Sequence, residues 1–296
     1  MKIKKFWRES TVNKILVVIL GLWIALAIIF AFYDLAISKA LYNASSQVAG
    51  TIQAFGEIPG ILFGLFAFFT LGTNLEFNGK RYKKTFFICE LAISIFLMYY
   101  ILNLVLTYLN INFKYVSLSG VPVFLGITLL SLFGFYLFKT KLGNFQKRNY
   151  LFAKVGAMTF VISAFIVEVL KVLWGRVRFR DLQQGFSNFT AWYLPQGITG
   201  GHSFPSGHAY LAWILIPLFL LAVNKRNIWK WIVLGLTLAY GIFISIERII
   251  AGAHYASDVL FSAGIVTITF LVIYKRYFLK DANSPTGKFK IARKGN

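Results

Sequence analysis

Three short stretches of the chain contain residue types that bind phosphate and could break its esters. They are Lys171 to Arg178, Phe204 to His208, and Arg248 with the His254 and Asp258 that follow it. A phosphate ester needs cationic donors for its non-bridging oxygens, a nucleophile, and an acid for the departing oxygen. Each stretch lies at the edge of an apolar segment, so the pattern predicts a phosphate site at the ends of several helices.

The cationic and backbone donors come from all three stretches. Lys171, Arg178 and Arg248 carry the positive charge, and the planar fork of arginine suits phosphate. Ser206 and Gly207 follow a proline and precede an apolar run, which predicts a helix start whose free N–H groups favour an anion. We expect these five residues to bind phosphate.

Two histidines are candidates for the bond-breaking steps. If the helix already includes His254, Asp258 lies one turn further on the same face and would fix the tautomer of the imidazole. We therefore expect His254 to be the nucleophile, forming a phosphohistidine, with Asp258 as its partner. His208 would protonate the departing alcohol and then activate water.

Neighbouring ionisable residues have less specific interpretations. Arg176, Arg180 and His202 are candidates for contacts to a second phosphate or a charged headgroup, or else for structural and interfacial roles. Glu168 lies three residues before Lys171, so the two should pair on one helix face. Taken singly, a histidine or arginine at the end of an apolar segment most often caps a helix or extends to headgroups. Two of only three histidines fall in these stretches, which favours a joint site.

The elements that position these residues are those of a membrane protein. The chain has 296 residues, of which 58% are hydrophobic and only 14% are charged, whereas soluble domains are nearer a quarter charged. One domain is expected. The net charge of +21 does not indicate nucleic-acid binding, because the Lys and Arg residues occur mainly in short loops between apolar segments, where membrane orientation explains them.

Eight apolar runs are long enough to cross about 30 Å of hydrocarbon. Backbone groups in lipid must bond within their own segment, so the predicted fold is all-α, a polytopic transmembrane helix bundle. The expected spans are 15–37, 55–75, 86–109, 119–138, 150–171, 206–223, 229–247 and 257–277.

The charge distribution orients this bundle. Most Lys and Arg residues lie at the N-terminus, in the loops at 80–84, 139–148 and 225–230, and in the segment 275–294. Eight spans put all five segments on one side, which the positive-inside rule makes cytoplasmic, with both termini. The three phosphate-binding stretches then face the outside of the cell membrane.

Subdivisions of the chain follow from the same pattern. Residues 1–149 hold the first four spans, residues 150–280 form the expected catalytic core, and residues 281–296 are a basic tail. Pro217 should kink the sixth span. The long outer connection after Leu173 is rich in aromatic residues, typical of an interfacial belt or of a rim that admits a headgroup. Glu57 and Glu90 lie near span ends, where we expect solvated positions.

The three stretches resemble the signature of the type 2 phosphatidic acid phosphatase superfamily. That signature is Lys, six residues, Arg-Pro; then Pro-Ser-Gly-His; then Ser-Arg, five residues, His, three residues, Asp. The resemblance implies the roles assigned above to His254, Asp258 and His208 and to the phosphate-binding residues, without a metal or other cofactor. Phe179 replaces the usual proline, and Glu247 the usual serine, where it could orient Arg248 or compete for it. Spans one to four exceed the common core of the family.

The expected function is hydrolysis of a lipid phosphate or diphosphate, such as polyprenyl diphosphate, phosphatidylglycerol phosphate or phosphatidic acid. The lipid bilayer and the lipid substrate are the expected partners. A phosphotransferase would use the same phosphohistidine with an acceptor other than water. A lipid transporter would place its ionisable residues nearer mid-membrane, and the related vanadium haloperoxidases are soluble.

Overall fold

The computed structural model describes residues 2–72, 81–109, 121–222 and 227–278. Within these ranges all regular elements are helices, as the composition predicts, and the predicted tail at 281–296 lies outside them. The longer helices are α1 (Lys2–Leu41), α2 (Gln47–Phe55), α3 (Ile58–Gly72), α4 (Arg81–Tyr108), α5 (Val121–Lys141), α6 (Gly143–Trp174), α9 (Asn227–Ile250) and α10 (Ala256–Ile273). The shorter elements are α7 (Gly207–Trp213), α8 (Phe219–Ala222) and the single turns Phe179–Asp181, Gln184–Phe186, Ile216–Leu218 and Tyr274–Phe278.

Seven of the described helical segments are long and apolar enough to cross a membrane. The second predicted span is built from two helices, α2 and α3, and runs from Gln47 to Gly72. The sixth predicted span differs from expectation. It is not one long helix but α7, a 3₁₀ turn containing Pro217, and α8. Proline cannot donate an amide hydrogen bond inside a helix, so the break at this position confirms the expected kink.

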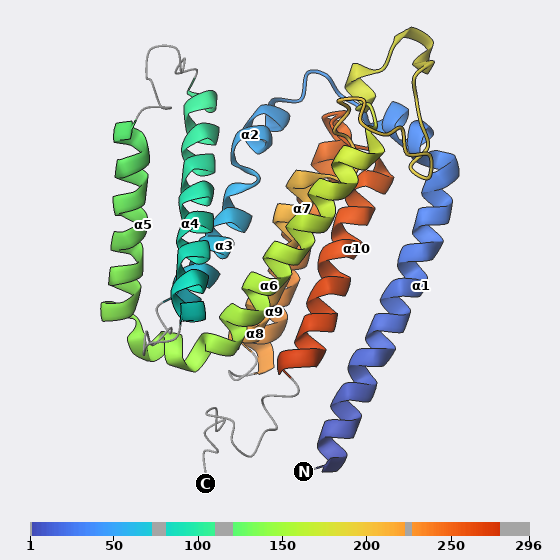
Figure 1. The fold of residues 1–296 in the computed structure, drawn as a ribbon. Coiled ribbons are helices and arrows are strands. Elements are labelled where there is room, and N and C mark those ends of the chain that lie inside the picture. Colours follow the sequence, from blue (N-terminus) through green and yellow to red (C-terminus); the bar gives the residue numbers. More distant parts are fainter. Residues whose placement is uncertain (1, 73–80, 110–120, 223–226, 279–296) are drawn as a thin grey trace.

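The helices form a bundle with the α4–α5 pair on one side and α1 on the other (Figure 1). Helices α6, α7, α9 and α10 lie between them. The C-terminal ends of α6 and α9 and the N-terminal end of α10 share the end of the bundle opposite to the N-terminus. The three sequence stretches border these helix ends, so the topology brings them to one place.

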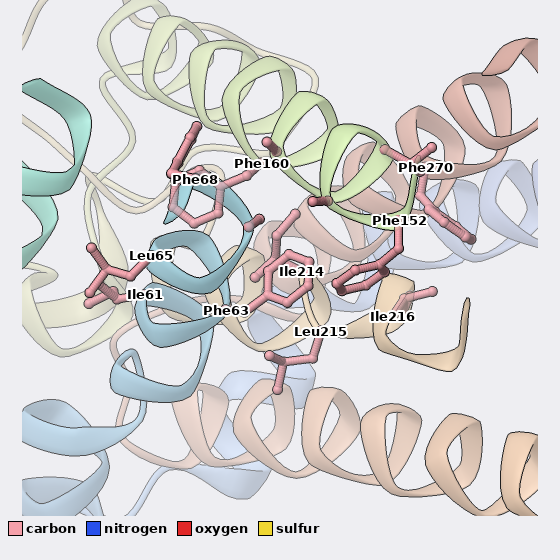
Figure 2. Close-up of a cluster of buried hydrophobic side chains, with 14 of the residues drawn as sticks. Ile61, Phe63, Leu65, Phe68, Phe152, Phe160, Ile214, Leu215, Ile216 and Phe270 are labelled. Carbon is pink, nitrogen blue, oxygen red and sulfur yellow. The ribbon is translucent and has the colours of Figure 1, made fainter. Parts of the chain in front are cut away.

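The core of the bundle is apolar and aromatic. Side chains from α3, α6, α10 and the segment Ile214–Ile216 interdigitate, as Figure 2 shows for Phe63, Phe152, Ile214 and Phe270. Helix α3 approaches α7 closely at Gly60, where a Cβ atom would lie only 2.1 Å from the carbonyl oxygen of Leu211. No residue with a side chain fits there, which makes this glycine a requirement of the α3–α7 contact.

The outer surface is apolar as well. Val17 and Phe32 of α1 are 68% and 79% exposed, and α5 presents Leu129 and Tyr136 in the same way. Such a surface suits hydrocarbon and not water. The polar groups described next are therefore held inside or at one end of an apolar bundle.

Candidate active site

His254 lies in a turn between α9 and α10, not inside a helix. Its backbone N–H donates to the carbonyl of Arg248 (3.2 Å), and α10 begins only at Ala256. Asp258 Oδ2 lies 3.7 Å from His254 Nδ1, within ion-pair range, but it is not the nearest acceptor of this nitrogen. The bonding partner is the Ser203 carbonyl, 2.6 Å from Nδ1. An Nδ1–H that donates to this carbonyl leaves the lone pair on Nε2.

Asp258 is connected to His254 both directly and through Ser203. The hydroxyl of Ser203 donates to Asp258 Oδ2 (2.6 Å), and the N–H of Tyr255 donates to the same oxygen (2.9 Å). The carboxylate thus fixes the two segments that flank the imidazole. His254 itself is buried, which lowers its pKa because burial disfavours the charged imidazolium. A neutral imidazole is the form that can attack phosphorus.

Asp258 is neutralised by a buried arginine. Arg176 Nη1 lies 2.6 Å from Asp258 Oδ1, and Arg176 Nη2 lies 3.0 Å from Asp34 Oδ2 on α1. All three side chains are at most 1% exposed. Ser257 joins them by donating its backbone N–H and its hydroxyl to Asp34. Charges this far from solvent persist only when paired, so the network clamps α1 and the Arg176 segment to the start of α10.

His208, in the first turn of α7, has a carboxylate partner from the N-terminal half of the chain. Its Nδ1 lies 2.8 Å from Oε1 of Glu57, and its Nε2 lies 3.3 Å from the carbonyl of Gln53. The other oxygen of Glu57 accepts from the hydroxyl of Tyr100 (2.5 Å). Glu57 is only 4% exposed, so the expectation of a solvated boundary position was wrong. Glu90 is also buried, at 2% exposed.

The start of α7 is fixed to α10 as the sequence pattern requires. Ser206 caps the helix by accepting from the N–H of Ala209 (3.3 Å), which leaves its own hydroxyl proton for an anion. The N–H of Ser206 donates to the carbonyl of Asp258 (3.2 Å). Lys171 Nζ lies 3.4 Å from where a Cβ of Gly207 would stand, so Lys171 faces this helix start. It also pairs with Glu168 (2.6 Å), which confirms that expectation.

Arg248 is fully buried and oriented by protein groups. Its Nε donates to Glu247 (2.6 Å), Nη1 to the side chain of Gln53 (2.7 Å) and Nη2 to a carbonyl of α2 (3.1 Å). Glu247 therefore binds the Nε side of the guanidinium. Of the two roles considered for Glu247, orienting Arg248 or competing with phosphate for it, this contact fits the first. Because a guanidinium has five N–H donors, these described contacts leave one on each terminal nitrogen for a phosphate oxygen.

The remaining cations divide into two kinds. Arg178 is half-buried and within electrostatic range of Arg248, and its Nε is a buried donor with no partner among the described residues. This free donor is compatible with the expected contact to an anion. Arg180 and His202 are exposed on the connecting loop, where a headgroup could reach them. Arg176 cannot serve a headgroup in this arrangement, because Asp34 and Asp258 occupy it.

Several residues of the site escaped the sequence analysis. No sequence motif includes Asp34, Gln53, Tyr100 or Ser203. The first three belong to helices outside the predicted catalytic core. Only Asp34 left a signal, since a carboxylate within an apolar span defaults to a functional or paired role. The others became visible only through their contacts.

Together these residues form a largely buried cluster of cations, carboxylates and two imidazoles. The charge of His208 is close enough to act on His254, and each ring turns Nδ1 to a protein acceptor. Lys171 faces the start of α7, and Arg178 and Arg248 lie within electrostatic range of each other. Cations next to histidines, in a bundle of apolar helices, are what we expect of a membrane protein that acts on a phosphate group.

Comparison with known proteins agrees with this class. Residues 152–281 match the family model of the PAP2 superfamily, which confirms the predicted resemblance for this part of the chain. The lipid A 1-phosphatase of Porphyromonas gingivalis is 37% identical over 103 residues, which are 34% of this chain and 22% of that protein. The chain thus matches about a fifth of the length of this curated relative. No solved structure matches the chain significantly.

Proposed function

We propose that this protein is an integral membrane phosphatase that hydrolyses a lipid phosphate or diphosphate through a phosphohistidine on His254, without a metal ion. The observation that carries the proposal is the pair of neighbouring buried histidines, both anchored through Nδ1, at a helix start faced by Lys171. Arg178 and Arg248 supply further donors for the phosphate oxygens. The match of residues 152–281 to the PAP2 superfamily supports the same chemistry.

In the first step, the lone pair on His254 Nε2 attacks phosphorus. The bond between phosphorus and the lipid oxygen breaks, and its electron pair goes to the departing oxygen. That oxygen takes a proton from His208 Nε2, while His208 Nδ1 keeps its hydrogen bond to Glu57. The products of this step are the lipid alcohol and a phosphorylated His254.

In the second step, a water molecule attacks the phosphorus of the phosphohistidine. His208 Nε2 accepts a proton from this water, and the phosphorus–nitrogen bond breaks with its electron pair returning to His254. Inorganic phosphate leaves, and both imidazoles regain their starting protonation. A phosphotransferase would follow the same path with an alcohol in place of water.

A lipid substrate is proposed because the helix ends that border the motif stretches lie at one end of an apolar bundle, the level at which a lipid headgroup lies. The relative named as a lipid A 1-phosphatase supports this class. Polyprenyl diphosphate, phosphatidylglycerol phosphate and phosphatidic acid all fit it. The burial of Arg176 removes one of two cations that would favour a diphosphate, so the site gives no preference for that substrate.

Phosphate release from a panel of lipid phosphates by the purified protein in detergent tests the proposal. Wild-type protein should release phosphate in the presence of a chelator, and His254→Ala should lower the rate by at least about 10⁴-fold, as for other lost nucleophiles. Acid-quenched wild-type protein should carry an acid-labile phosphate that His254→Ala lacks. Retained activity in this variant would refute the nucleophile, and loss with chelator would refute the metal-free mechanism. Transfer to an added alcohol would identify a transferase.

A further inference from the structure

Glu57 is a buried carboxylate that the matched family region does not include. It lies at the junction of α2 and α3, 4% exposed, with both oxygens occupied by side chains of other helices. His208 of α7 lies 2.8 Å from Oε1, and the hydroxyl of Tyr100 of α4 lies 2.5 Å from Oε2. The junction is itself anchored, since Tyr240 donates to the carbonyl of Gly56 (2.9 Å).

A carboxylate in this place is costly if its role is only to fill space. Replacing a buried charged pair by apolar side chains of similar volume is often neutral or stabilising. Ile61, whose backbone N–H donates to the carbonyl of Glu57, belongs to the apolar core, so an apolar side chain at position 57 would stand next to that core. A fixed charge with two donors is therefore better explained by what it does to one of them.

We infer that Glu57 is a positioning residue for His208: it holds Nδ1–H of the imidazole so that Nε2 delivers the proton to the departing oxygen. The inference rests on the proposed function, in which His208 is the acid. When His208 is doubly protonated, its two N–H groups point to Glu57 and to the carbonyl of Gln53. The short bond to the carboxylate keeps the ring in place, and the long contact at Nε2 is the one a substrate oxygen can replace.

Other charged groups near Glu57 offer a second role for it. Lys171 is within electrostatic range of the carboxylate, and Glu168 is within range of Tyr100. On this alternative Glu57 would balance the charge of Lys171 and tune phosphate binding. The two roles differ in chemistry, because phosphate binding does not depend on the leaving group, whereas proton delivery does.

The test compares two substrates that differ in their need for an acid. Dodecyl phosphate expels an alkoxide that must be protonated, whereas a nitrophenyl phosphate bearing a dodecyl chain expels a stable phenolate. Values of kcat/KM report the first step for each. Glu57→Gln should lower kcat/KM for dodecyl phosphate by on the order of 10-fold or more, up to the 10²–10⁴ that a general acid itself contributes. It should leave kcat/KM for the nitrophenyl substrate within about threefold of the wild-type value. His208→Ala should show the same selectivity, and the double variant should add little to it.

Glu90→Gln is the matched control. Glu90 is another buried glutamate, on α4, that contacts no residue of the site among the described interactions. It should leave the ratio of the two kcat/KM values unchanged. Equal losses on both substrates in Glu57→Gln, or no loss on either, would overturn the positioning role. If Glu57→Gln shows no cooperative thermal transition, Tyr100→Phe replaces it in the same comparison of the two kcat/KM values. A loss confined to dodecyl phosphate in Tyr100→Phe would support the positioning role, and an unchanged ratio of the two values would overturn it. Wild-type protein that hydrolyses neither substrate would instead refute the proposed function.

Discussion

His254 and His208 both direct Nδ1 to a protein acceptor, and the proposed mechanism uses Nε2 of each ring, but the acceptors of Nδ1 differ. The acceptor of His254 is a neutral backbone carbonyl, and that of His208 is a carboxylate. A neutral acceptor adds little stabilisation to an imidazolium, whereas a carboxylate pairs with it. At the scale of single residues, this difference in acceptor fits the two different roles proposed for the histidines.

The state of His254 can be measured directly. Burial lowers its pKa, so the imidazole should stay neutral at neutral pH and become protonated only below the ordinary value of about 6.5. Nitrogen NMR of histidine-labelled protein across pH 4.5–8 (about the range in which histidine titrates) should show this midpoint. The single variants His202→Gln and His208→Gln identify the other two imidazole signals. A midpoint for His254 at or above 6.5 would contradict the prediction.

Elements outside the family match complete the site. Helix α1 supplies Asp34 to Arg176, α2 supplies Gln53 to Arg248, and the α2–α3 junction supplies Glu57 to His208. Each of these polar residues contacts a residue of the three motif stretches. The predicted boundary between residues 1–149 and 150–280 therefore separates, along the chain, residues whose side chains contact one another.

The contact between α3 and α7 should be sensitive to a single methyl group. Gly60→Ala would push a Cβ atom against the backbone of Leu211, at a cost of about 1–3 kcal/mol typical of overpacking. Because Glu57 directly precedes α3 and His208 lies on α7, phosphatase activity should fall together with the thermal midpoint.

Gly126→Ala on α5 is the control for this substitution, since nothing lies within 4 Å of its added Cβ. It should leave both the midpoint and the activity unchanged. Wild-type behaviour of Gly60→Ala would show that α3 and α7 are not packed as closely as described.

At the scale of the whole molecule, the site lies at one end of the bundle and the N-terminus at the other (Figure 1). The distribution of Lys and Arg predicts that the N-terminal end is cytoplasmic. A site on the outside would act on lipids of the outer leaflet.

Cysteine labelling in intact cells tests this orientation. In a Cys89→Ser background, Ile198→Cys introduces a thiol in the loop next to the site, at a position 85% exposed. A membrane-impermeant maleimide should label it without permeabilisation. The C-terminal end of α5 lies at the opposite end of the bundle (Figure 1). Thr140→Cys, at an exposed position in the last turn of α5, should be labelled only after permeabilisation. The reverse pattern would put the site in the cytoplasm.

The sequence by itself determined the class of fold and most of the anion site. Apolar runs long enough to cross a bilayer dictate helices, because no other open backbone satisfies its hydrogen bonds in lipid. Lys171, Ser206, Gly207 and His208 border helix ends, and helix ends in a bundle converge. The positions of these residues next to the apolar runs were therefore enough to predict that they lie together.

Only the tertiary structure decided how the charges inside the bundle are paired. The partners Asp34–Arg176, Glu57–His208 and Gln53–Arg248 are separated by more than a hundred residues, and no spacing rule connects such positions. Asp258 was expected to pair with His254, and it lies 3.7 Å from Nδ1, but the nearer acceptor of this nitrogen is the carbonyl of Ser203, from the loop before α7. Pairing of this kind follows from which helix faces meet, because a buried charge is stable only beside the partner that packing brings to it.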